Sequence, residues 1–199
     1  MRKKILISIF VILFLILIIG GGFFWWQNRE IKGSPEDYII KETPEGKIVE
    51  NKKAGLVVKA PEGWIEKKIE LLEGSVVFDT PDIEGKWEDE MVKPPLKRGC
   101  TIEATVVYKK MDFDEIKKEI KELHAGLGIK SEEFEIVTIN NRQVLKNTFD
   151  SKFIGPGIGA YFINKNKIYS FGVYWAPEEK ERCIQEFDKF LATVSIQPH

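Results

Sequence analysis

The stretch EFEIVTINNRQVLKNTF (residues 133–149) decides the fold of this 199-residue chain, together with GIGAYFINKNKIYSFGVYW (residues 157–175). Asn140 and Asn141 separate two strand-like runs, and asparagine tolerates the positive φ angles of a two-residue hairpin turn. After a turn at residues 164–166, every second side chain is large and apolar, which predicts a strand with one buried face. Two successive hairpins predict an antiparallel sheet.

Three earlier segments extend this sheet. Residues 101–108 alternate over eight positions, which predicts a strand. Residues 56–58 and 75–78 are shorter candidates, and each is followed by a proline turn. Trp64 and Trp175 fit buried positions in such a sheet. The strands follow one another along the chain, so we expect most of the pairing to be antiparallel.

Two helices interrupt the strands. Asp112 and Glu115 have the spacing of a capping box, and a helical stripe of Phe113, Ile116, Ile120 and Leu123 follows until Gly126 can end the helix. A second helix begins after Pro177, with an apolar face of Cys183, Ile184, Phe187, Phe190, Leu191 and Val194. The pattern predicts an α+β fold in which helices flank a central antiparallel sheet as an α/β/α sandwich.

The order of these motifs resembles PsbP-like domains. LVVKAPEGW (residues 56–64) is similar to the apolar strand and Pro-x-Gly-Trp turn that open such domains, and VVFDTPD (76–82) is similar to their second strand. The late hairpin, the final helix and the closing Val-Ser-Ile (194–196) resemble their ending. The resemblance implies a non-enzymatic accessory or interaction module, known best from the lumenal side of photosystem II. This chain differs by its N-terminal apolar segment, so no binding residue is transferred.

That apolar segment spans residues 5–26 and follows a basic stub at residues 1–4. As a helix it would be about 33 Å long, enough to cross a bilayer core of about 30 Å. The basic start and the aromatic close at residues 23–26 favour a single-pass anchor with a cytoplasmic N-terminus. A cleaved signal peptide is the alternative. We expect a juxtamembrane spacer at residues 27–53, whose second half could add an edge strand, and an extracytoplasmic domain at residues 54–199.

The charge balance bears on possible partners. Three of the 30 basic residues precede the apolar segment, so the rest of the chain sets 27 Lys and Arg against 31 Asp and Glu, a net charge of −4. Nucleic acid binding depends on neutralising phosphates with a basic surface. The sequence therefore gives no reason to expect a nucleic acid partner.

Residues that could carry catalysis are few. The chain has two histidines, and we expect His124 to lie in the last turn of its helix, where a partly charged imidazole favours the negative helix end. Cys100 and Cys183 show no metal-ligand spacing, so they form either one long-range disulfide or two buried thiols. No serine nucleophile motif is present, and we expect no enzymatic activity and no cofactor. A thiol-dependent enzyme is the weaker alternative.

The long loop between Pro81 and Gly99 is the best candidate for binding. Its second half is basic and proline-rich, its first half is acidic, and it could clasp itself or contact a partner. We expect partner contacts from Trp87, Glu88, Asp89, Lys97 and Arg98. The acidic side chains are also a weaker candidate for calcium, with Asp82, Glu84, Glu88, Asp89 and Glu90 as ligands. The function expected is a membrane-anchored accessory domain that binds a protein or small ligand near its membrane-facing surface.

Overall fold

The computed structural model describes residues 33–69, 74–85, 95–151 and 155–197. The predicted anchor at residues 5–26 lies outside these ranges, as do Trp87, Glu88, Asp89 and Glu90. Among the described residues, no helix is long and apolar enough to cross a bilayer. Anchoring of the chain therefore stays a prediction from the sequence.

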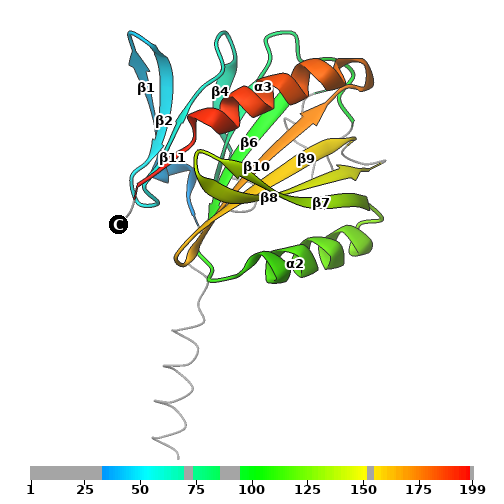
Figure 1. The fold of residues 1–199 in the computed structure, drawn as a ribbon. Coiled ribbons are helices and arrows are strands. Elements are labelled where there is room, and N and C mark those ends of the chain that lie inside the picture. The colour runs from blue at the N-terminus through cyan, green and yellow to red at the C-terminus, as the bar shows by residue number, and fades with distance from the viewer. Residues whose placement is uncertain (1–32, 70–73, 86–94, 152–154, 198–199) are drawn as a thin grey trace, which may run out of the picture. The chain divides into compact units, whose positions relative to one another are not determined.

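The larger sheet has seven strands, and every neighbouring pair is antiparallel. Their spatial order is β4-β5-β6-β10-β9-β8-β7 (Figure 1). The bounds are Ile65–Ile69 for β4, Ser75–Asp79 for β5, Cys100–Val107 for β6, Lys130–Ile139 for β7, Arg142–Asp150 for β8, Gly157–Asn164 for β9 and Lys167–Trp175 for β10. Both predicted hairpins are confirmed, and Asn140 and Asn141 have φ angles of 50° and 61°.

A second sheet of four strands, in the order β1-β2-β3-β11, was not predicted. Its strands are β1 (Tyr38–Thr43), β2 (Gly46–Asn51), β3 (Leu56–Lys59) and β11 (Ser195–Ile196), and a short 3₁₀ turn, η1 (Pro35–Asp37), precedes β1. The compact unit thus begins at residue 32, within the expected spacer of residues 27–53. The apolar islands there are too short for a clear pattern, yet Tyr38 and Val49 are each only 1% exposed in the core.

The first predicted helix is confirmed as α2 (Phe113–Gly126). Asp112 Oδ1 accepts the backbone N–H groups of Asp114 and Glu115, both at 2.9 Å, and Glu115 Oε2 accepts the backbone N–H of Asp112 at 2.8 Å. This capping box satisfies helix donors that have no partner within the helix. The predicted buried stripe is wrong at one position, because Leu123 is 61% exposed.

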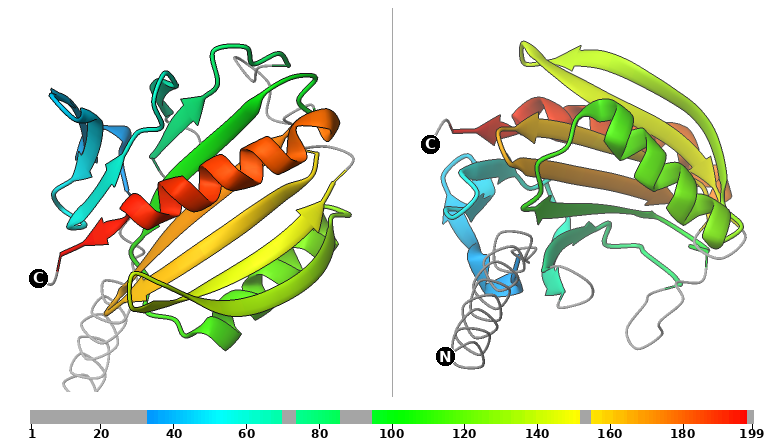
Figure 2. Two further views of the ribbon diagram at one scale, coloured as in Figure 1. Left: turned by 45° about the horizontal axis from the view of Figure 1, so that its top comes forward. Right: turned by 90° about the horizontal axis from the view of Figure 1, so that it is seen from below.

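The second helix, α3 (Lys180–Thr193), follows the 3₁₀ turn η2 (Pro177–Glu179). It packs on one face of the large sheet, and α2 lies on the opposite face (Figure 2). Rings join α3 to the sheet, since the centroid of Phe190 lies 5.3 Å from Phe78 and 5.7 Å from Phe171. The face under α2 is lined by a smaller cluster of Met111, Ile116, Ile120, Leu145 and Ile168. The helices therefore flank the sheet as predicted, with the second sheet added.

Gly157 in β9 marks a point where the chain has no room for a side chain. A Cβ atom there would lie 2.7 Å from the Val173 carbonyl oxygen and would overlap the Phe149 ring. Gly172 in the neighbouring strand β10 differs, because a Cβ atom there would meet only the Tyr174 ring, at 3.4 Å.

We predict that Gly157→Ala lowers the free energy of unfolding by about 1–3 kcal/mol, because a neighbouring backbone oxygen must move. The matched variant Gly172→Ala should change it by less than about 0.5 kcal/mol. Urea unfolding of both variants checks this, and equal stabilities would contradict it.

Candidate functional site

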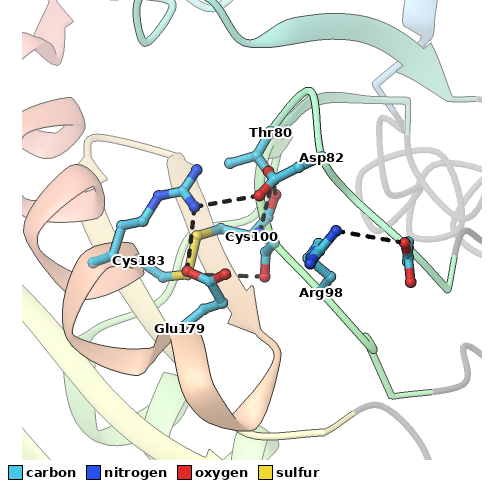
Figure 3. Close-up of polar contacts among 9 residues, drawn as sticks. Thr80, Asp82, Arg98, Cys100, Glu179 and Cys183 are labelled. Atoms are coloured by element: carbon cyan, nitrogen blue, oxygen red, sulfur yellow. Dashed lines mark hydrogen bonds and ion pairs between the residues drawn. A yellow bond between two sulfur atoms is a disulfide. The ribbon is translucent and has the colours of Figure 1, made fainter.

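Cys100 and Cys183 form a disulfide at the base of the long loop (Figure 3). Cys100 is the first residue of β6, Cys183 lies in the first turns of α3, and their Cα atoms are 5.7 Å apart. Both residues are fully buried. Of the two alternatives for these cysteines, the structure shows the disulfide, so both sulfur atoms are bonded and neither is a free thiol.

Ion pairs hold the first arm of the loop beside α3. Asp82 Oδ2 lies 3.4 Å from Nη1 of Arg182, which also lies 3.2 Å from Oε2 of Glu179. Thr80, just before the loop, accepts the backbone N–H of Cys100 through its hydroxyl at 3.0 Å. The disulfide and this polar chain fasten the same corner of the molecule (Figure 3).

The second arm of the loop pairs with the first. The Glu84 N–H donates to the Arg98 carbonyl at 3.1 Å, and the Lys97 N–H donates to the Glu84 carbonyl at 3.0 Å. The Glu84 and Arg98 side chains also approach to 3.8 Å, and both are about 60% exposed. The two described arms of the loop therefore clasp each other.

The predicted site residues are only partly brought together. Lys97 and Arg98 lie exposed on the second arm, and the other expected partner contacts lie outside the described residues. Two of the five calcium candidates are described, and each faces an arginine: Asp82 pairs with Arg182, and Glu84 with Arg98. Within the described ranges, no cluster of three or more potential metal ligands occurs.

Hydrogen bonding and charge shift the pKa values of Asp82 and Arg182. The pKa of Asp82 is lowered mainly by a hydrogen bond from the Thr80 side chain; burial opposes this, and Arg182 lowers the pKa further. The pKa of Arg182 is raised, mainly by its hydrogen bond to Asp82. Both side chains keep 40% or more of their surface exposed, so solvent screens the pair.

An open groove of about 560 Å³ lies beside this corner. It is formed by α3 and the β3–β4 connection, with Trp64 and Phe190 among its apolar lining and Lys59, Glu186 and Lys189 among its charged lining. Arg182 lines the groove and also binds the loop, so the two features share a residue. No sequence motif indicates this groove, because the pattern around Trp64 predicts a core residue, and Trp64 is only 8% exposed.

His124 lies in the last turn of α2 as expected, but the expectation of a partly charged ring there is not met. Its side chain is only 8% exposed and its ring meets the edge of Phe149 at 5.5 Å. Burial lowers the pKa of His124, which favours the neutral imidazole over the partly charged form expected at a helix end. His124 takes the inward position that the stripe had assigned to Leu123.

The fold is similar to that of solved structures, although no sequence comparison finds a relative. No protein-family model matches the chain, and no curated protein sequence matches it. Among solved structures, its fold is similar to that of the cyanobacterial PsbP protein CyanoP from Synechocystis sp. PCC 6803, with a TM-score of 0.50, 11% identity, and coverage of 80% of this chain and 92% of that one. A Pseudomonas aeruginosa protein of unknown function aligns with a TM-score of 0.49 at 9% identity, over 81% of this chain and 99% of that one.

The two helices and the antiparallel sheet thus define an α+β domain of mostly β structure. Its particular likeness is to the PsbP fold, as the strand order of the sequence motifs implied. At 11% identity the likeness concerns the fold alone.

We predict that replacing both Cys100 and Cys183 with alanine lowers the free energy of unfolding by about 4 kcal/mol, because the bond closes a long loop in the unfolded chain. The cysteines are 83 positions apart. Chemical denaturation of the oxidised protein and of the double variant checks this. A difference below about 1 kcal/mol would contradict a structural role.

A second prediction concerns pH. A carboxyl whose pKa is lowered on folding contributes stability above its unfolded pKa, and that stability is lost as pH falls through the folded pKa. We therefore expect wild-type protein to be more stable than Asp82→Asn at pH 7 and the difference to disappear in strong acid. Arg182→Gln should keep most of this pH dependence, since the Thr80 hydrogen bond is its largest cause. Thermal unfolding across acidic pH measures it, and a pH-independent difference would contradict it.

Proposed function

We propose that this protein is a membrane-tethered, extracytoplasmic binding domain without catalytic activity, and that its loop at residues 81–99 contacts a partner protein. The observation that carries the proposal is the double fastening of this loop. Its base is joined to α3 by a disulfide, and its arms are clasped by Glu84 and Arg98. A long loop whose ends are fixed loses less conformational freedom on binding, which favours affinity.

The chemistry of the loop supports recognition of a polar protein surface. Lys97 and Arg98 are exposed on one arm, and Arg182 borders the adjacent groove. Arginine is enriched at interface hot spots, and tryptophan, represented in this loop by Trp87, is enriched as well. Trp87, Glu88 and Asp89 remain proposed contacts from the sequence.

The disulfide also supports the proposed location. Disulfides persist in oxidising compartments and are rare in the cytosol. A single-pass anchor at residues 5–26 with a cytoplasmic N-terminus would place Cys100 and Cys183 on the extracytoplasmic side. The two arguments are independent and lead to the same topology.

The proposed site differs in place from the membrane-facing position expected from sequence. The loop precedes β6, whereas η1, near the start of the compact unit, lies beyond the other end of β6. Two contacts place η1 there: Asp37 pairs with Lys53, and the Lys53 ammonium lies over the ring of Tyr108, which follows β6. An eight-residue strand is about 23 Å long. We therefore propose that the loop faces away from the bilayer and is available to a partner in the extracytoplasmic space.

The test uses a photo-crosslinking amino acid placed at position 97 of the full chain in its membrane. We expect a crosslinked adduct from position 97 and none from position 118, which is also an exposed lysine but lies on α2. Adding Trp87→Ala should lower the yield at position 97 by at least about tenfold, the effect of losing one hot-spot side chain.

Two results would overturn the proposal. Equal adducts from positions 97 and 118 would show that the loop has no privileged contact. An unchanged yield from position 97 after Trp87→Ala, with position 97 still crosslinking, would remove Trp87 from the interface.

A further inference from the structure

Lysines gather at the end of the domain opposite the loop. Three connections meet there: the β2–β3 turn carries Lys52 and Lys53, the segment after β6 carries Lys109 and Lys110, and the β9–β10 turn carries Lys165, with Lys167 next to it at the start of β10. Figure 1 shows the β9–β10 turn beside the start of α2. We call these six residues the lysine end.

Direct contacts hold two of the three connections together. Lys167 Nζ donates to the backbone carbonyls of Lys53 at 3.1 Å and Ala54 at 3.2 Å. The ammonium groups of Lys53 and Lys167 also lie 5.2 Å and 5.9 Å from the centroid of the Tyr108 ring. Tyr108 follows β6 directly, so the ring and the backbone fix two positive charges at one place.

Other lysines of this end project into solvent. Lys52, Lys110 and Lys165 are exposed, each at a different one of the three connections. Lys165 also lies close enough to act on Lys167, whose pKa is lowered first by burial and then by the charge of Lys165.

The carboxylates nearby balance most of this charge, so docking depends on the exposed lysines that lie outside the ion pairs described here. Asp37 pairs with Lys53 at 3.4 Å, and Glu119 pairs with Lys109. Glu36 is bound by the Ser34 hydroxyl. Of the acids at the start of α2, Asp112 and Glu115 form the capping box and Asp114 pairs with Lys117. Lys52, Lys110 and Lys165 remain exposed above these pairs.

The chain reaches the compact unit at this same end. Ser34 and Asp37, among the first described residues, lie beside Gly74 and Lys53 respectively. The apolar segment ends at residue 26, and the expected spacer begins at Gln27. Only six residues lie between Gln27 and Ser34. With residues 5–26 proposed as the anchor, the length of this linker limits how far Ser34 can lie from the bilayer.

We propose that the lysine end is a docking surface for anionic phospholipid headgroups, which fixes the orientation of the domain on its membrane. The proposal rests on the proposed tether. Lysines near an anionic bilayer surface are each attracted to it, and the attraction decays within a Debye length. Docking through Lys52, Lys110 and Lys165 would place the Tyr108 end of β6 at the membrane surface. The other end of β6, which carries the loop, would then point away from the membrane.

The test uses the full chain in nanodiscs of phosphatidylcholine, with or without phosphatidylglycerol, and measures amine acetylation of single lysines by mass spectrometry. We expect Lys52, Lys110 and Lys165 to react at least about threefold more slowly when phosphatidylglycerol is present. Lys180, exposed on the first turn of α3 at the loop end, should react at the same rate in both discs.

A variant separates charge from simple proximity. Lys52→Gln, Lys110→Gln and Lys165→Asn together remove three charges, and asparagine tolerates the φ angle of +57° at position 165. In this variant, Lys53 and Lys109 should lose the protection that phosphatidylglycerol gives them in the wild-type protein. Protection that persists would overturn the proposal.

Further outcomes separate a failure of lipid docking from a failure of the proposed membrane tether. Equal acetylation rates in both discs, for a chain that resists extraction from membranes by alkaline carbonate, would overturn lipid docking and leave the tether intact. Extraction of the chain by carbonate would overturn both. Protection by inorganic phosphate in discs of phosphatidylcholine alone would show a site for free anions and would overturn docking to a lipid surface.

Discussion

The pairing of β6 with β10 is the constraint on which the other features depend. Its register runs without interruption from Val107 opposite Ile168 to Cys100 opposite Trp175. One end of this ladder brings Cys100 to the start of α3, and the other end brings Tyr108 to the β9–β10 turn. A shift by one residue would turn every side chain of β6 to the opposite face and separate both ends from their neighbours.

Much of the fold could be predicted from local pattern. The Asn140–Asn141 turn, the capping box of α2 and the apolar face of α3 each combine a periodic run with a residue that has one strong conformational role. The second sheet could not be predicted in the same way. Its strands β1 and β2 show no regular alternation of buried and exposed side chains. Tyr38 and Val49 are buried by contact with the rest of the domain, which the local sequence pattern does not indicate.

The sequence indicated the loop at residues 81–99 as a candidate site but did not indicate how the base of the loop is fastened. Its charged loop is visible as a change of composition, and Cys100 and Cys183 as a pair without metal spacing. Arg182 was missed, because a lone arginine on the outer side of an amphipathic helix has no distinguishing pattern. Its importance comes from the chain crossing that sets Asp82 within 3.4 Å of it, 100 residues earlier in the sequence. For a similar reason, the sequence predicted a buried Leu123, whereas the structure buries His124 and exposes Leu123. Both residues lie at the edge of the apolar stripe, where only packing against the sheet decides which of them is buried.

The order in which the cysteines are synthesised gives the disulfide a role in time. At ordinary elongation rates of about 5–20 residues per second, Cys183 is made roughly 4 to 17 s after Cys100. All of β6 to β10 is made in that interval, and hairpins form within microseconds once released. Strands β6 to β10 therefore have time to pair before the bond can close, whereas the rest of α3 and β11 are made only after Cys183.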